Sequence, residues 1–277
     1  MTKVKLLGVL LLAAVPLQAA PRTPKPGADE LVLRALGATA LYSAVERVQV
    51  FRAGAKPKTL KALLSVFPGG KTRREVMIGR KKTPAMIHVR DGREIFIFWP
   101  AKKKVWRGPS LEDTPAAALA RLHSLYELSV STGGRVAKRL TWRVNMRNSN
   151  GTLRRSLWVD RETGLALKRE IYRADESLAR RERIVKLELG AEISPALLHL
   201  ETPSGTGTVA FNASPFFPRW APDGFIPTDS SPSAMSFSDG ADTYTIERPA
   251  GGGKPVIMGD LAEDDAAKVL ASLEERK

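Results

Sequence analysis

The 277-residue chain contains no cysteine and only three histidines. Without cysteine there is no disulfide bond, thiol nucleophile, cysteine-ligated zinc or lipid-modified N-terminal cysteine. His88, His123 and His199 are far apart in sequence, and none has a second histidine or a carboxylate at the spacing of metal ligands. We therefore expect no metal site and no cofactor.

Catalytic motifs are also missing. The chain has no G-x-S-x-G elbow, no phosphate-binding P-loop and no dinucleotide-binding fingerprint. Asp160 and Glu162 resemble a pair of carboxylates for acid–base chemistry, but they fall in Asp-Arg-Glu-Thr-Gly, a run typical of a turn. We favour the turn, and the sequence predicts a protein that is not an enzyme.

A long apolar run occurs only at the N-terminus. Lys3 and Lys5 precede an apolar stretch over 6–15, and small residues follow it at Ala19 and Ala20. This three-part pattern is typical of a secretory signal, and the stretch is short for a membrane span. We expect a signal peptide over 1–20, cleaved after Ala19 or Ala20, and a soluble, periplasmic or otherwise exported protein. An uncleaved membrane anchor is the alternative.

The net charge of +15 is unevenly distributed. Residues 1–200 contain 38 Lys and Arg against 17 Asp and Glu, whereas residues 201–277 contain 6 against 12. A basic region could bind nucleic acid or anionic lipid head groups, or could be the solvated face of a sheet. Export argues against nucleic acid as a partner, and we favour the sheet face. The opposite signs suggest two units with different partners, or two units that attract each other.

Residue patterns along the chain predict mostly strands. A short helix is expected over 28–40 and a second over 114–126, where Thr114 can cap and Pro115 suits the first turn. Strands are expected over 41–51, 60–67, 74–79, 86–90 and 94–99, followed by an antiparallel meander over 136–189. Residues 203–232 contain six prolines and no steady periodicity, which indicates a linker. A hairpin, a strand near 256–258 and a final helix complete the chain.

Large aromatic residues recur in the predicted strands. A curved sheet with such residues on one face can enclose an apolar cavity. The candidates for its lining are Phe96, Phe98, Trp106, Trp142 and Trp158. The alternative is that they pack against the helices as ordinary core.

Three stretches resemble known envelope proteins. Residues 156–168 read Ser-Leu-Trp-Val-Asp-Arg-Glu-Thr-Gly-Leu-Ala-Leu-Lys, residues 220–225 read Trp-Ala-Pro-Asp-Gly-Phe, and residues 237–246 read Phe-Ser-Asp-Gly-Ala-Asp-Thr-Tyr-Thr-Ile. The first resembles a hairpin shared by the LolA lipoprotein carriers and the RseB/MucB regulators of the envelope-stress sigma factor. The other two are similar to the small C-terminal domain of the RseB/MucB family, which the single-domain carriers lack.

This resemblance implies an α+β fold: a large antiparallel half-barrel with helices on its concave side, and a small C-terminal α+β domain. The expected domains are a signal peptide at 1–20, a LolA-like half-barrel at 21–202, a Pro/Ser-rich linker at 203–232 and a small domain at 233–277. A family-like C-terminal unit would begin at about 219. The candidates for contacts between the domains or with a partner are Trp220, Phe225 and Tyr244.

The resemblance also implies a function. Such a regulator binds the exported domain of a membrane anti-sigma factor, and a lipid-like or acylated signal releases it. Two alternatives stay open at this point: a periplasmic lipid or lipoprotein carrier of the LolA type, and an exported adaptor without a ligand. The oligomeric state is not determined by the sequence.

Overall fold

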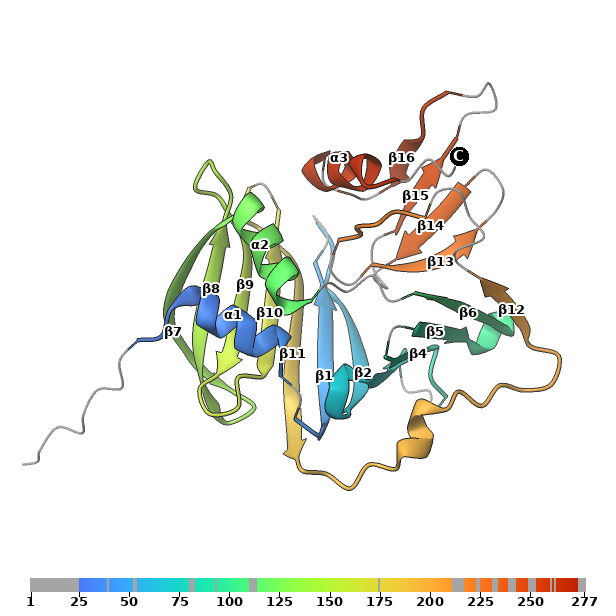
Figure 1. Cartoon of the computed structure of the whole chain (residues 1–277), viewed down its shortest axis with the longest axis horizontal. Helices are drawn as coiled ribbons and strands as arrows, with labels where there is room; N and C mark the ends of the chain where they lie inside the picture. Colours follow the sequence, from blue (N-terminus) through green and yellow to red (C-terminus); the bar gives the residue numbers. More distant parts are fainter. Residues whose placement is uncertain are drawn as a thin grey trace, which may run out of the picture.

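In the computed structural model, a large curved sheet lies beside a smaller one, and helices pack against both (Figure 1). The expected signal peptide lies outside the described residues. In the described part of the chain, no helix is long and apolar enough to cross a membrane. The structure describes residues 25–273 except 39, 52–53, 80–82, 93, 110–113, 174, 211–216, 223–224, 231–233, 239–242, 249–252, 260 and 262.

Two helices precede or interrupt the strands of the large sheet. Helix α1, Ala28–Leu36, buries Leu31 completely. Helix α2, Pro115–Leu125, begins after Thr114, whose hydroxyl accepts a hydrogen bond from the amide of Ala117 at 3.2 Å. This side-chain cap satisfies one of the amides that a helix N-terminus leaves unpaired. Both predicted helices are confirmed.

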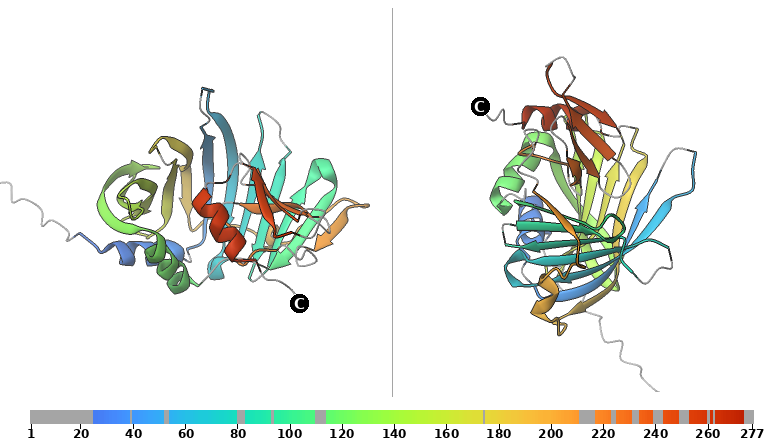
Figure 2. Two further views of the ribbon diagram at one scale, coloured as in Figure 1. Left: turned by 90° about the horizontal axis from the view of Figure 1, so that it is seen from above. Right: turned by 90° about the vertical axis from the view of Figure 1, so that its right-hand side faces the viewer.

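Twelve strands form the large sheet in the order β12-β6-β5-β4-β3-β2-β1-β11-β10-β9-β8-β7. All neighbours pair antiparallel except β12, which runs parallel to β6. The sheet is open, curls strongly at its β7–β11 end, and has β7 and β12 as edges (Figure 2). The expected class, α+β with a large curved sheet, is confirmed. The strands are β1 Tyr42–Val50, β2 Lys58–Val66, β3 Thr72–Met77, β4 Met86–Asp91, β5 Glu94–Trp99, β6 Lys104–Pro109, β7 Glu127–Val136, β8 Arg139–Arg147, β9 Leu153–Asp160, β10 Ala166–Tyr172, β11 Leu178–Leu189 and β12 Gly207–Ala210.

The strand register separates the two faces of this sheet. Leu157, Arg169, Glu182, Val48 and Leu60 lie directly opposite one another on β9, β10, β11, β1 and β2. Residues directly opposite in antiparallel strands point to the same side. We call the face that carries these five residues the inner face, and the opposite one the outer face.

Two different covers protect the inner face. Helices α1 and α2 pack over β7, β8 and β9, where Leu31 and Val32 contact Val144 and Val159. The small C-terminal unit packs over β1 to β6. Its four strands run in the order β13-β14-β15-β16. The small unit consists of β13 Ile226–Ser230, β14 Ala234–Ser238, β15 Thr243–Glu247, β16 Val256–Gly259 and α3 Glu263–Ala271.

The structure adds strands where the residue patterns were weaker. Strand β7 starts at residue 127, nine residues before the expected meander. Residues 203–232, expected as a linker, contain β12 of the large sheet and β13 of the small one. Each sheet thus receives one strand from this segment. The proposed domain boundaries remain predictions.

Candidate binding surfaces

One apolar core joins the small unit to the inner face of the large sheet. We call it the inter-unit core. The large sheet contributes Val48, Val50, Leu60, Ala62, Val76, Met86, Ile97 and Trp106, and the small unit contributes Met235, Phe237, Tyr244, Ile246 and Val269. All of these side chains are buried. Contact between the units therefore rests on close packing of apolar groups.

Several aromatic rings belong to this core. Trp106 is 1% exposed, and the ammonium of Lys102 lies 5.7 Å from its ring centroid. Phe237 stacks on Tyr244 with centroids 4.9 Å apart, and Phe225 meets the same tyrosine at 5.1 Å and 54°. Burial, aided by Asp265, raises the pKa of the Tyr244 hydroxyl, so this group stays neutral.

Trp220 connects the start of the small unit to the end of α3. Its backbone amide donates to the Ser272 hydroxyl at 3.2 Å, and its carbonyl accepts from the same hydroxyl at 3.3 Å. Its side chain packs on the inter-unit core, with the Lys268 ammonium 5.9 Å from the ring. The structure thus brings Trp220, Phe225 and Tyr244 together at one contact between the units.

Charged residues occupy the inner face next to the apolar core. Glu46 accepts two hydrogen bonds from Arg74, at 2.8 and 3.0 Å. Arg180, which is 4% exposed, donates to Glu182 at 2.6 Å. Burial disfavours the Glu182 carboxylate, but Arg180 and other nearby arginines outweigh it and hold the pKa of Glu182 well below its usual range. We call Glu46, Arg74, Arg180 and Glu182 the polar strip.

His88 lies opposite Arg74 in the sheet, and its Nε2 atom is buried without a hydrogen-bond partner in the described part of the chain. Burial and the positive charges of Arg74 and Arg90 lower the pKa of His88 to about 4. The ring is therefore neutral at pH 7. Protonating it would place a charge beside two arginines.

We expect the free energy of unfolding to fall as the pH drops from 6.5 towards 4. The folded-state pKa of His88 is lower than the ordinary value of 6.5, so the unfolded chain binds the proton first and acid favours unfolding. The loss attributable to this group is on the order of 2 kcal/mol. Denaturant titrations at pH 7 and 4.5 measure it. His88→Gln, which cannot ionise, should show a correspondingly smaller drop; an equal drop in both proteins would contradict the assignment.

The five candidate cavity residues do not surround one space. Trp106 lies in the inter-unit core, whereas Trp142 packs under α1 and α2 at the other end of the inner face. Trp158 points to the outer face, because it lies opposite Arg143 and Lys168. Phe96 and Phe98 belong to a separate cluster with Leu198 and Leu200. The five side chains thus divide among four packed clusters.

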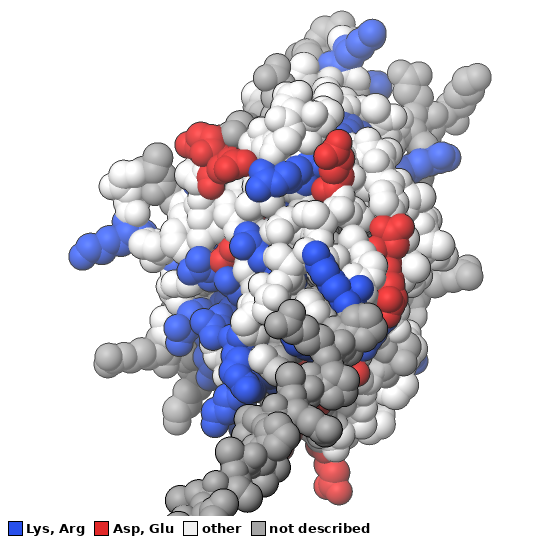
Figure 3. All heavy atoms as spheres, turned by 90° about the vertical axis from the view of Figure 1, so that its left-hand side faces the viewer, with Lys and Arg blue, Asp and Glu red and all other residues white. Residues whose placement is uncertain are grey.

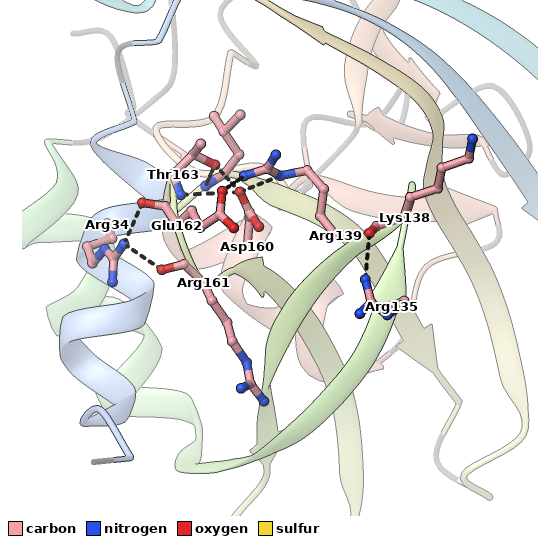
Figure 4. Close-up of polar contacts among 9 residues, drawn as sticks. Arg34, Arg135, Lys138, Arg139, Asp160, Arg161, Glu162 and Thr163 are labelled. Carbon is pink, nitrogen blue, oxygen red and sulfur yellow. Dashed lines mark hydrogen bonds and ion pairs between the residues drawn. The ribbon is translucent and has the colours of Figure 1, made fainter. Parts of the chain in front are cut away.

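The turn after β9 is held by its own acidic residue (Figure 4). Asp160 is 1% exposed and accepts hydrogen bonds from the hydroxyl and amide of Thr163 and from Nε of Arg139, the last at 2.8 Å. Arg34 of α1 donates to the carbonyls of Arg161 and Glu162. The carboxylates at 160 and 162 thus belong to the turn that joins β9 to β10, as the sequence indicated. Arg34 of α1 and Arg139 of β8 bind to this turn. No group of three or more potential metal ligands occurs among the residues that the structure describes.

Charge is also unequal on the surface. At the end of the molecule formed by α1, β7 and β8, Lys and Arg side chains gather along one side, and most of the Asp and Glu side chains lie away from this group (Figure 3). A polar pocket of about 590 Å³ lies elsewhere, where the segment after β11 passes the ends of β1 and β2; Ser43, Ser65 and Glu188 are part of its lining.

Sequence reasoning missed the polar strip. Glu46 lies between Ala44 and Val48 on the inner face, and Glu182 is two residues before Ile184 on that face, so each interrupts an apolar pattern. The signal that could have found them is an acidic residue on the apolar face of a strand, since a buried charge requires a partner.

An open, twelve-stranded curved sheet with helices on one face and a small α+β unit on the same face defines a class of α+β proteins with an added C-terminal unit. A LolA superfamily protein from Nitrosomonas europaea is similar with a TM-score of 0.34 and 8% identity, covering 64% of this chain and 99% of that one. The model of the MucB/RseB N-terminal domain matches residues 47–201. The chain belongs to the MucB/RseB family.

Solved structures extend this likeness beyond the matched domain. The structure of MucB in complex with MucA(peri) has a TM-score of 0.50 and 20% identity, and the match covers 91% of this chain and all of that one. The structure of MucB alone has the same TM-score and identity, over 88% and 96% of the two chains. A search of curated proteins finds no match. Both units of this chain therefore share the fold of MucB.

Proposed function

We propose that this chain is an exported, non-catalytic binding protein that binds the exported domain of a membrane anti-sigma factor. The observation that carries the proposal is the family membership together with a match that spans the full length of MucB in its complex with MucA(peri). The N-terminal pattern supports export, and the small unit supports a regulator over a single-domain carrier.

The inter-unit core gives this function a physical basis. A partner that contacts both units would bind best when their relative arrangement is fixed, and Trp220, Phe225 and Tyr244 pack in the core that joins the units. A lipid-like ligand that binds another arrangement better would shift the population away from the partner-binding one. We propose this release as the regulatory step.

The test uses surface plasmon resonance to measure binding of the purified mature chain to the exported segment of a membrane anti-sigma factor from the same genome. We expect saturable binding that Trp220→Ala weakens, because this change loosens the small unit. Wild-type protein that does not bind any such segment would refute the proposed function.

Lipid sensing is tested separately. Lipids are extracted from the purified chain and identified by mass spectrometry, and a fatty-acid probe is added to the preformed complex. We expect the probe to release the anti-sigma segment. If the probe does not release the segment, lipid sensing is wrong and the proposed binding of the anti-sigma factor still stands. Bound lipid in a chain that binds no anti-sigma segment would favour the LolA-type carrier.

A further inference from the structure

A row of positive side chains crosses the outer face of the large sheet. Lys168 of β10 lies directly opposite Arg183 of β11, Arg183 opposite Arg47 of β1, and Arg47 opposite Lys61 of β2. The cations therefore succeed one another from strand to strand, about 4.8 Å apart, over about 14 Å. We call these four residues the cation row.

Fold stability does not explain this row. Like charges directly opposite on neighbouring strands are destabilising. Arg47, Lys61 and Arg183 are exposed, and no ion pair is found for them among the described residues. Lys168, at the other end, pairs with Glu170 at 2.9 Å. Three neighbouring cations are thus left to solvent on a face that the small unit does not cover.

The surroundings of the row indicate its partner. Beside the cation row, on the same face, Val45 lies directly opposite Leu63, and Leu63 is 36% exposed. Nearby cations are neutralised, since Arg181 pairs with Glu170 at 2.6 Å and Lys186 with Glu188 at 3.8 Å. The uncompensated positive charge is therefore confined to the cation row, beside the apolar pair Val45 and Leu63. A lipid surface would be matched better by positive charge spread over the whole face.

A helix matches these two lines. Carboxylates spaced three and four residues apart recur about every 5.4 Å along one side of a helix, close to the distance between strands. Ten helical residues span about 15 Å, the length of the cation row. Apolar residues on the adjoining stripe would cover Val45 and Leu63. We propose that the outer face of β10, β11, β1 and β2 docks an acidic amphipathic helix of a protein partner.

The probe is a synthetic amphipathic helix of about 20 residues, with glutamates on one stripe and leucines on the next. Its binding to the mature chain is followed by fluorescence anisotropy at low and high salt. We expect binding that salt weakens. The triple variant Arg47→Ser, Lys61→Ser, Arg183→Ser should bind about tenfold more weakly, the loss expected for three exposed ion pairs.

A second triple variant, Lys56→Ser, Lys58→Ser, Lys254→Ser, removes the same charge from exposed positions outside the row. It should bind the peptide within about twofold of the wild type. Equal losses in the two triple variants, or no binding by the wild type, would overturn the proposal. Vesicles of phosphatidylglycerol and phosphatidylcholine are the third arm. If vesicle binding requires the cation row while peptide binding does not, the row binds a lipid surface and the proposed docking of a helix is wrong.

This inference does not rest on the proposed function, because the row lies on the face opposite the inter-unit core. Loss of peptide binding in the row variant with anti-sigma binding intact would separate the two surfaces.

Discussion

Trp106→Ala is expected to lower the free energy of unfolding by about 3–5 kcal/mol and to release the small unit from the large sheet. The indole is 1% exposed, lies directly opposite Ile97 and belongs to the inter-unit core that the small unit completes. Removing it leaves a cavity that rigid neighbours on a sheet cannot close. Chemical denaturation measures the loss of stability, and limited proteolysis within residues 211–225 measures the release.

Trp142→Ala is the matched control. Trp142 packs on the same inner face but under α1 and α2, with Arg161 3.9 Å from its ring centroid. This change should also destabilise the protein, because it removes a large ring from a packed cluster. It should leave the rate of proteolysis within residues 211–225 unchanged. Equal cleavage in both variants would show that Trp106 does not hold the small unit.

The hairpin of β4 and β5 and the meander were predictable because their signals are local. Asp91-Gly92 joins β4 to β5, and alternation of Leu140, Trp142 and Val144 marks β8 as a strand. Strand β7 was harder to predict because Gly133 and Gly134 interrupt it and suggest a turn. A Cβ atom at Gly133 would meet Thr141 and Trp158, and this close approach between β7 and its neighbours explains the glycine. Such a reason is tertiary and is absent from the local pattern.

The binding surfaces were only partly predictable. Trp220, Phe225 and Tyr244 were candidates because their motifs resemble a family; they pack in one cluster, and their role in binding stays a prediction. Phe96 and Phe98 alternate with Ile97 and Trp99, so both faces of β5 are apolar. Which face meets the small unit depends on how that unit docks. The sequence predicts a strand buried on both faces but does not assign a cover to either.

The charge difference between the two parts of the chain has a different meaning in the structure. The sequence suggested attraction between a basic and an acidic unit. The contact that joins them is an apolar core, and ion pairs such as Arg74–Glu46 and Arg180–Glu182 lie within the large sheet. Salt should therefore affect the cation row on the outer face much more than the contact between the units.

Asp160→Ala is expected to cost about 3 kcal/mol of stability, because it breaks a buried pair and leaves donors without an acceptor. The carboxylate is 1% exposed, pairs with Arg139 at 2.8 Å, and accepts from the hydroxyl and amide of Thr163. Glu162→Ala is the control: that side chain is 81% exposed, and losing its bond to Arg139 should cost no more than about 1 kcal/mol. Denaturant titration compares the two. Similar losses of stability in the two variants would mean that Arg139, rather than the buried carboxylate, organises the turn between β9 and β10.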